Sequence, residues 1–375
     1  MGVRVKAMGQ KVSSADHFGY PTVRRLVPPR DNLGLVDTYV RRHPDATPYH
    51  RSAWLEAVYE GYGHPVSLLA AFDDRNEVVG ILPLCHLSVP GGKPGLVSQA
   101  YCDLGGPLAD SPAVEEALIR EGVYLAKDLR AKSLSFRRSG ARLDDEQSES
   151  LSGRHKVSML CQLPESSEAL FKSYKPKLRS QIRKAEKNGL TGSVRHDPEA
   201  LEAFYKVFTA NMHRLGSPVH AWSWFRALHA HYGADMIVGM VSFQDVPIGA
   251  GIVLLNGQRA SIPWASTLSE YNHLAPNMLL YWTLLSYVAD RGINVFDFGR
   301  SSPGEGTYRF KKQWGAVPHA LKWSNLLESE LEATGNAEPS HAAKTLRSWV
   351  ESLWRSLPLS VANRLGPLIR KYISL

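Results

Sequence analysis

The sequence has few cysteines and no long apolar run. Cys85, Cys102 and Cys161 are its three cysteines, they lie far apart, and no CxxC pair occurs. This spacing argues against a disulfide framework and a structural zinc site, and it fits a reducing compartment such as the cytoplasm. No apolar stretch reaches the ~18 residues that a membrane span needs, and residues 1–30 contain no apolar segment typical of a secretory signal.

Several catalytic motifs and an excess of acidic charge are also missing. The chain has no G-x-S-x-G elbow, no P-loop and no H-E-x-x-H pair, which argues against a serine hydrolase of that type, a P-loop nucleotidase and a zinc peptidase. Lys and Arg number 44 against 36 Asp and Glu, so the net charge is +8. This surplus favours anionic partners: nucleic acid, phosphorylated substrates or an acidic membrane surface.

The order of apolar segments predicts an α/β (α+β) fold of two similar lobes. In the second half, helices are expected over 176–188 and 276–290. Short apolar runs bounded by turn residues predict the strands of that half, over 236–243, 247–255, 259–265, 294–298 and 321–327. The first half repeats this order in part, with a helix over 48–62 and strands over 66–72, 78–84 and 133–136. Polar residues 138–153 are expected to form a mobile loop.

These patterns divide the chain into four parts. We expect a flexible basic arm over 1–30, a first lobe over 31–158, a second lobe over 159–330 and an amphipathic helical tail over 338–375. Apolar and basic residues alternate at helical spacing in the tail, and Pro358 interrupts them. The tail therefore suits an interfacial membrane anchor, and it equally suits packing on the protein itself or on a partner.

The most basic stretch runs from Phe171 to Arg195, with eight basic residues and one acidic residue. Arg179 and Arg183 lie one helical turn apart and can hold phosphate oxygens together. A solvated helix face beside an acidic part of the same protein would show the same composition.

A second candidate site is the segment from Phe296 to Gly315, where a strand leads into a Gly-, Ser- and Pro-rich loop and a short basic helix. Loops after strand ends often carry the chemistry of α/β proteins. Cations in this segment can bind an anion, and they are Arg300, Arg309, Lys311 and Lys312. Glu305 can act as a general base. A tight structural turn is the alternative.

Two further turns supply candidates. In Asn211–Pro218 an expected helix ends in a Gly-Ser-Pro turn, and Arg214 near that end can face a cleft; a structural role is the alternative. The glycine-rich turn from Tyr101 to Pro107 can line a cleft between the lobes through Tyr101 and Asp103, although a plain structural loop fits this turn as well.

Three segments together resemble the FemAB family over roughly residues 30–328. They are Lys177–Leu190, Phe296–Arg300 (FDFGR) and Phe310–Gly315 (FKKQWG). The turn at Tyr101–Pro107, Leu215–Pro218 and the tail make the chain most similar to the branch found with exosortase (PEP-CTERM) exopolysaccharide systems. This resemblance implies two tandem GNAT-like lobes, with acyl transfer onto an amine in or beside the second lobe.

The resemblance also implies roles for particular residues. The lysine of the family's Phe-Lys motif maps onto Lys311, at the reacting centre. The acceptor amine would lose its proton to Glu305, Asp297 or water. Acetyl-CoA-using relatives carry a glycine-containing loop where this chain has residues 268–277, a segment without glycine. Asn277, at the end of this segment, is a further candidate for substrate binding. No metal is implied.

The sequence alone does not identify the acyl donor or the acceptor. Aminoacyl-tRNA and acetyl-CoA both carry phosphates, so the cations suit either donor. The expected activity is acyl transfer to a cell-envelope or polysaccharide precursor by a cytoplasmic protein that can contact the inner face of the membrane. The alternatives are an acetyl-CoA-dependent N-acetyltransferase and a non-catalytic module that binds an anionic glycolipid or nucleic acid.

Overall fold

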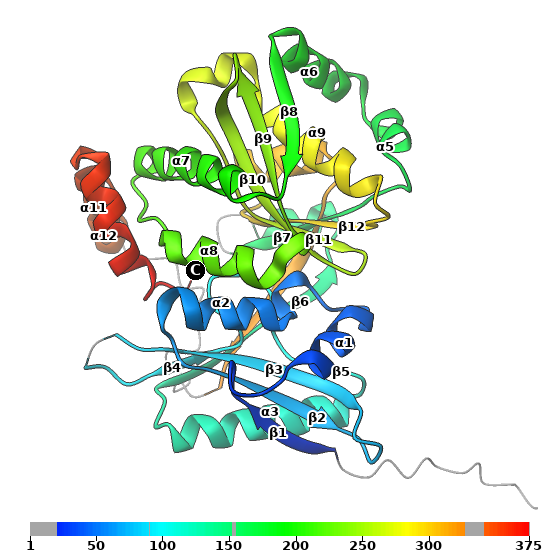
Figure 1. Cartoon of the computed structure of the whole chain (residues 1–375), viewed down its shortest axis with the longest axis vertical. Helices are drawn as coiled ribbons and strands as arrows, with labels where there is room; N and C mark the ends of the chain where they lie inside the picture. Colours follow the sequence, from blue (N-terminus) through cyan, green and yellow to red (C-terminus); the bar gives the residue numbers. More distant parts are fainter. Residues whose placement is uncertain (1–20, 90, 152–154, 327–340, 375) are drawn as a thin grey trace, which may run out of the picture.

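One mixed sheet passes through the whole molecule (Figure 1). The computed structural model describes residues 21–89, 91–151, 155–326 and 341–374, and the side chains from residue 349 onward in the last range. In the described chain, the sheet has 13 strands in the order β1-β2-β3-β4-β6-β13-β7-β12-β11-β10-β9-β8, and β5 pairs with β3 beside this path. The strands are β1 (Thr22–Leu26), β2 (Val66–Phe72), β3 (Val78–Leu87), β4 (Gly95–Val97), β5 (Leu108–Ala109), β6 (Ser133–Arg142), β7 (Val157–Gln162), β8 (Leu190–Arg195), β9 (Met236–Phe243), β10 (Val246–Asn256), β11 (Arg259–Thr267), β12 (Val295–Ser301) and β13 (Val317–Asn325).

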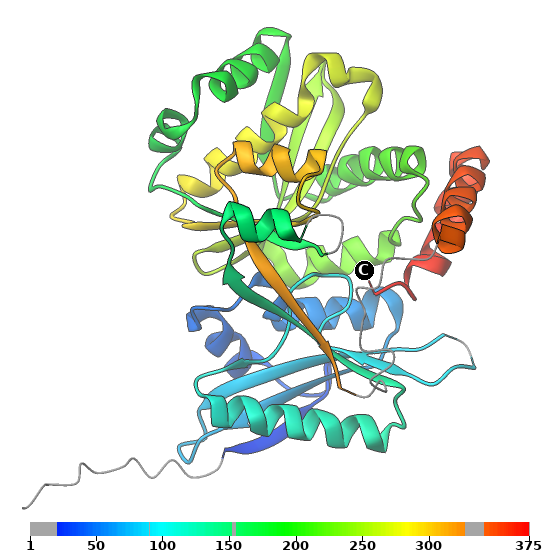
Figure 2. The same cartoon turned by 180° about the vertical axis from the view of Figure 1, so that it is seen from behind.

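Helices cover both faces of this sheet in each lobe. In the first lobe α3 packs on β2 and β3, and α1 and α2 lie on the other face; in the second lobe α9 packs on β8–β11, opposite α7 and α8 (Figures 1 and 2). The helices are α1 (Gly34–Arg42), α2 (Ser52–Tyr62), α3 (Pro112–Asp128), α4 (Asp145–Ser150), α5 (Ser167–Ser173), α6 (Pro176–Lys187), α7 (Pro198–Leu215), α8 (Trp222–Tyr232), α9 (Pro276–Ala289), α10 (Gly306–Gln313), α11 (His341–Ser356) and α12 (Leu359–Arg370), with short 3₁₀ turns at Pro48–His50, Gly233–Asp235 and Ser269–Leu274.

The local signals in the sequence account for several helix ends. Ser111 caps α3, because its hydroxyl accepts a hydrogen bond from the Val114 N–H, and Pro112 takes the first helical position. Gly189 follows α6 with a φ of +83°, a conformation that glycine adopts without steric cost. The expected α/β order of two similar lobes is confirmed.

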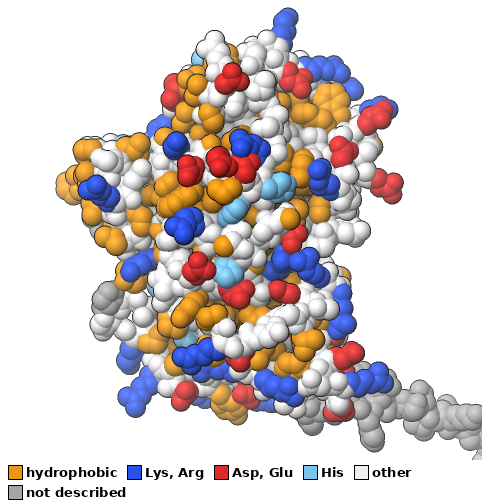
Figure 3. Space-filling view, in the orientation of Figure 1, with side chains coloured by type: hydrophobic (Ala, Val, Ile, Leu, Met, Phe, Trp, Pro, Cys, Tyr) orange, Lys and Arg blue, Asp and Glu red, His pale blue; other side chains and the backbone are white. Residues whose placement is uncertain are grey.

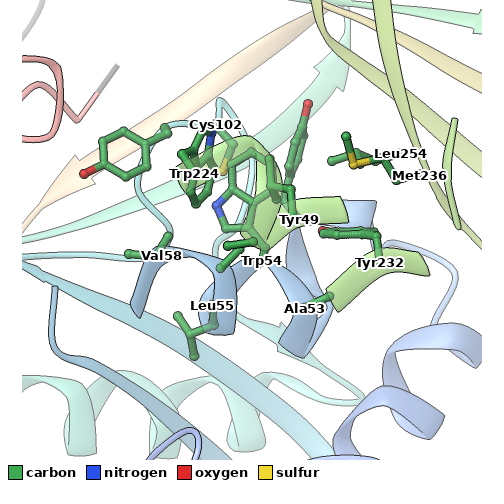
Figure 4. Packing of buried hydrophobic residues seen from close by; sticks show 14 of the residues in the cluster. Tyr49, Ala53, Trp54, Leu55, Val58, Cys102, Trp224, Tyr232, Met236 and Leu254 are labelled. Atoms are coloured by element: carbon green, nitrogen blue, oxygen red, sulfur yellow. The ribbon is translucent and has the colours of Figure 1, made fainter. Parts of the chain in front are cut away.

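An aromatic cluster joins the two lobes. The Trp54 ring of α2 lies 5.1 Å from the Trp224 ring of α8 (Figure 4). The Trp54 ring also stacks on Trp264 of β11 at 6.1 Å. Trp54 and Trp224 are fully buried, and burying aromatic rings of this size contributes several kcal/mol. Gly61 permits this packing, since a Cβ there would lie 2.8 Å from the Trp224 Cα. One hydrophobic core cluster therefore spans both lobes, and each lobe has a further cluster of its own.

Three segments differ from the sequence-based expectations. Thr22–Leu26, within the expected basic arm, forms β1 because it pairs with β2; residues 1–20 of the arm lie outside the described residues. The expected mobile loop at 138–153 holds the end of β6 and all of α4, whose first turn is closed by a capping box between Asp144 and Gln147. β13 inserts between β6 and β7, so the last strand of the second lobe also closes the first lobe.

The tail forms two helices, and Pro358 separates them as expected. Both helices pack on α7 at the edge of the second lobe (Figure 1). Trp354 and Ala362 are buried in this contact, and a Cβ on Gly366 would lie 2.9 Å from the Val219 nitrogen. The inner face of the tail thus packs on the protein itself. None of the helices in the described ranges is long and apolar enough to cross a membrane.

Candidate functional site

Two neighbouring parallel strands of the second lobe separate at the site. β11 and β12 pair through Arg259–Val295, Ala260–Phe296 and Ser261–Asp297 only. Beyond this point β11 pairs with β10 along its other edge. We call the opening between the two strands after Ser261 and Asp297 the strand gap.

A bulge shapes β12 where it borders the strand gap. The pairing of β12 with β7 breaks between Asp297 and Arg300 and then resumes at Ser158. Gly299 takes a φ of +71° within this bulge, a conformation that a residue with a side chain adopts only with strain. Gly299 and Arg300 were expected in a loop, and they are strand residues because this pairing resumes.

A cavity of about 240 Å³ opens into the strand gap, and we call it the gap cavity. Both strands, the Tyr101 turn, α10 and the tail contribute to its walls. The lining residues are Tyr49, Tyr101, Cys102, Asp103, Ile262, Pro263, Trp264, Phe298, Gly299, Arg300, Lys311 and Arg370. The wall combines aromatic rings with three cations, which suits a ligand with an apolar and an anionic part.

Lys311 enters the gap cavity from α10. Its Nζ donates hydrogen bonds to the carbonyl oxygens of Gly299 at 3.1 Å and Arg300 at 2.9 Å. An ammonium has three protons, so one remains for a bound ligand. Burial lowers the pKa of Lys311 to about 8, while the nearby carboxylates of Asp297 and Asp103 oppose this shift. Lys311 therefore stays mainly protonated at neutral pH.

Asp297 has a buried carboxyl group, and its charge interacts favourably with that of Lys311. Its Oδ1 accepts hydrogen bonds from the Gly299 N–H at 2.8 Å and from the Ser158 hydroxyl at 3.2 Å. Burial raises the pKa of Asp297 to about 6, and the charge of Asp103 adds to this rise, while the Gly299 N–H and Lys311 oppose it. A carboxyl with a pKa near 6 can accept a proton at neutral pH, which suits a general base.

The first lobe contributes Asp103 to the same place. Its Oδ1 lies 3.2 Å from the Arg300 Nε, and its Oδ2 accepts a hydrogen bond from the Arg300 N–H at 3.3 Å. Tyr101 of the same turn also lines the gap cavity. The structure thus brings five sequence-predicted residues together at the strand gap: Tyr101, Asp103, Asp297, Arg300 and Lys311.

A larger cavity of about 460 Å³ lies between the lobes, and we call it the lobe cavity. Asp297 lines it from the second lobe. His50, Gly106 and Arg137 line it from the first lobe, and Arg259 and His319 add further basic groups. Asp297 thus borders the lobe cavity while Lys311 borders the gap cavity, and successive residues of β11 and β12 line first one cavity and then the other.

The other predicted residues lie away from both cavities. Arg179 and Arg183 are on α6, whose inner face packs on α9, and Arg183 lies over the Phe171 ring at 5.2 Å. Neither arginine lines either cavity, so the structure does not bring the basic residues of α6 together with Lys311 at the candidate site. The remaining residues are exposed: Arg214, Asn277, Glu305 and Arg309. Arg214 donates to Asn211 at 2.9 Å, and Asn277 accepts from Thr267 at 3.4 Å.

Two arginines of the site were not predicted from the sequence as site residues. Arg370, at the end of α12, lines the gap cavity, and burial lowers its pKa. Arg137 of β6 lines the lobe cavity and donates to the carbonyl oxygens of Gln99, Cys102 and Ser374 at 3.1, 2.8 and 3.1 Å. Neither arginine lies in a motif. Arg137 is followed directly by Arg138 in the segment Ser133–Arg142, and no local signal distinguishes the two.

Part of the chain matches a known protein family, and its fold is similar to solved structures. Residues 172–312 match a family model described as an acetyltransferase (GNAT) domain. The structure of FemX aligns with a TM-score of 0.64 and 16% identity, over 81% of this chain and 98% of that chain. No curated protein matches the chain.

Two further solved structures share the fold. L-PGS from Bacillus licheniformis aligns with a TM-score of 0.53 and 11% identity, over 87% of this chain and 98% of that chain. The C-terminal domain of a protein described as a putative lysylphosphatidylglycerol synthetase, from Agrobacterium fabrum, aligns at 0.51 and 12%, over 83% and 97%. The chain therefore has a tandem GNAT-like fold, and its second lobe contains the part that matches the GNAT acetyltransferase domain.

Proposed function

We propose that this protein transfers an acyl group from a phosphate-bearing carrier to an amine of a cell-envelope or exopolysaccharide precursor, as a FemAB-like enzyme. The observation that supports this most is that β11 and β12 line two cavities in succession, one bordered by Asp297 and the other by Lys311, at the point where the strands separate. An enzyme that joins two substrates needs two binding spaces with one reacting centre between them.

The gap cavity suits the acyl donor. Beyond Ser261, β11 presents to the strand gap an edge that β12 does not pair with, and an extended donor can hydrogen-bond to such an edge as an added strand does. Arg300, Lys311 and Arg370 supply positive charge for its phosphates. The lobe cavity then receives the acceptor.

The reaction follows from the protonation states of the central pair. The acceptor amine attacks the donor carbonyl carbon and passes a proton to the Asp297 carboxylate. The Lys311 ammonium donates its remaining proton as a hydrogen bond to the oxyanion that forms. The carbon–carrier bond then breaks, and the carrier leaves with the electron pair. No covalent bond to the protein forms.

Two acyl donors are considered in the proposal. Aminoacyl-tRNA is favoured by the alignment with FemX over nearly its whole length, whereas acetyl-CoA is favoured by the family match over residues 172–312. The name of one further neighbour includes lysylphosphatidylglycerol, a lipid, which supports an acceptor in the envelope. We place the enzyme in the exosortase-associated branch of FemAB, at the inner face of the membrane.

Lys311→Ala tests this function against a module that only binds. Radiolabelled acetyl-CoA and radiolabelled aminoacyl-tRNA are each supplied with an extract of lipid- and nucleotide-linked envelope precursors, and label in the extract is counted. We expect one donor to be used and the variant to lose about a hundredfold or more in rate. Lys312→Ala is the matched control, because Lys312 is exposed and pairs with Asp145 at 2.6 Å.

Each result of this assay has a defined meaning. Transfer that depends on Lys311 and not on Lys312 supports the enzyme, and the label that is transferred names the donor. Equal rates in Lys311→Ala and the wild type would contradict the proposed centre. Binding of both donors without transfer would favour the non-catalytic module.

A further inference from the structure

The outer face of the tail is the most apolar exposed surface among the described residues. Nine of the 17 large apolar side chains that are exposed there belong to residues 349–373. They are Trp349, Val350, Leu353, Leu359, Val361, Leu365, Leu368, Ile369 and Ile373. Trp349 is 67% exposed and Leu368 60%. We call these nine side chains the tail patch.

The tail patch faces outward because the opposite side of the same helices is occupied. Trp354, Ala362 and Gly366 hold α11 and α12 against α7 and Val219. The two helices stand at one edge of the molecule, where apolar and basic side chains lie together on the surface (Figures 1 and 3). A contiguous exposed apolar face of this kind marks an interaction site.

The charges beside the tail patch have one dominant sign. Residues 341–375 contain six Lys and Arg and one acidic residue, Glu351. Arg355 and Arg364 are exposed on these helices, and Glu351 lies 3.7 Å from Arg355. Apolar side chains with Trp, flanked by cations, are the composition of helices that lie in the surface of an anionic bilayer.

We propose that the tail patch docks this protein on an anionic lipid surface. A second copy of the chain fits the patch less well, because a two-fold contact would bring the same cations of both copies together. A bilayer with anionic headgroups accepts the apolar side chains and neutralises the arginines at once.

Docking would place the site next to the lipid. α12 ends at Arg370, which lines the gap cavity, and the Tyr101 N–H donates to the Ser374 carbonyl at 2.7 Å. The segment that contacts the lipid therefore leads directly into the candidate site. A lipid-linked acceptor would then reach the enzyme at the membrane, and this consequence rests on the proposed function. The docking itself does not depend on the proposed function.

The test measures binding of the full chain to vesicles by sedimentation. Vesicles of phosphatidylcholine alone are compared with vesicles of equal parts phosphatidylcholine and phosphatidylglycerol. We expect binding to the anionic vesicles, weakening as salt is added. Trp349→Ala combined with Leu368→Ala should weaken this binding at least about tenfold, because two large apolar side chains are removed. Arg364→Gln should weaken it about fivefold on anionic vesicles only.

The control is Leu35→Ala, since Leu35 is 61% exposed on α1, in the first lobe. This variant should bind as the wild type does, and all variants should keep the wild-type unfolding midpoint because the changed side chains are exposed. Absence of binding to anionic vesicles, or equal binding by the double variant, would overturn the proposal. So would a dimer in solution that the double variant dissociates, which would assign the tail patch to a second copy. Vesicle binding without acyl transfer would sustain the docking and count against the proposed function alone.

Discussion

The two lobes contain the same strand opening, and only the second lobe leaves it accessible. In the first lobe β4 and β6 pair in parallel through Gly95–Ser133, Leu96–Leu134 and Val97–Ser135. In the second lobe β11 and β12 pair in parallel through three residue pairs as well. A helix connects the strands in each case, α3 in the first lobe and α9 in the second. The lobes differ beyond the third pair, where the strands separate.

In the first lobe the chain itself fills the opening. The Ser98 N–H donates to the Ser135 carbonyl at 2.9 Å, and the Gly105 N–H donates to the Arg137 carbonyl at 3.1 Å. The buried Arg137 guanidinium binds three carbonyl oxygens of this turn and of the tail. Among the described residues, no such turn occupies the strand gap of the second lobe, where a cavity lies instead.

In the proposed reaction, this difference gives the first lobe a supporting role and the second lobe the reacting centre. The turn that fills the first opening also carries Asp103 to Arg300 across the lobe boundary. The first lobe thus loses a binding space and gains a role in orienting the site of the second lobe. Three substitutions test this division of roles, and the largest effect is expected in the second lobe.

Asp297→Asn should reduce the rate of acyl transfer about a thousandfold, because the base is lost while the shape is kept. In the wild type, we expect kcat to rise with pH through about 6 as Asp297 ionises, and to fall through about 8 as Lys311 loses its proton. The variant should lack the rise near pH 6. A pH–rate profile with the donor that supports transfer checks this, and an unchanged rise would exclude Asp297 as the base.

The same variant should be more stable at neutral pH. The folded pKa of Asp297, about 6, lies above the usual aspartate value of 3.8, so its contribution to stability is present below pH 4 and lost as pH rises through 6. Replacing the carboxyl by an amide removes this penalty, on the order of 3 kcal/mol at pH 7. Urea unfolding at pH 4 and pH 7 measures it; a variant less stable at both would contradict the assignment.

Arg137→Ala should lower the free energy of unfolding by about 2–3 kcal/mol, because three buried carbonyl oxygens lose their donor. Urea unfolding gives this value. Arg138→Ala is the control, since Arg138 is partly exposed and pairs with Glu115, and an ion pair of that kind contributes up to about 1 kcal/mol. Equal losses in the two variants would show that Arg137 does not hold the filled opening together.

Arg370→Ala should raise the KM for the donor about tenfold with a smaller change in kcat, because one of three cations leaves the gap cavity. Arg364→Ala, on the exposed side of α12, should leave the KM unchanged when the acceptor is soluble. Steady-state kinetics with the donor that supports transfer separate the two. A KM that moves equally in both variants would mean that the tail affects the site through its fold alone.

The sequence predicted much of the fold because helix caps and apolar periodicity are local. The strands over 66–72 and 236–243 and the helix at 276 begin where their patterns begin. The expected loop at 138–153 was wrong in part, because β6 is extended by pairing with β13, whose residues lie more than 170 positions later. A pairing of that separation leaves no local pattern.

The sequence predicted several residues of the candidate site, but it did not predict which of the candidates lie together. Lys311 and Arg300 follow from the basic segment after a strand, and the structure places them in one cavity. Arg179, Glu305 and Arg309 come from the same charged segments but line neither cavity, because charge patterns do not say which side of a helix meets a cavity. These three roles remain predictions without support from either cavity.

By itself, the sequence determined the order of helices and strands, the positive charge and the apolar tail, since each depends on neighbouring residues. Tertiary structure alone decided that β11 and β12 separate after Asp297, that Asp103 and Arg370 reach the gap cavity, and that Asp297 is buried enough to titrate near pH 6. Burial and charge at the site come from segments hundreds of residues apart, and their free energies exist only once the chain has brought those segments together.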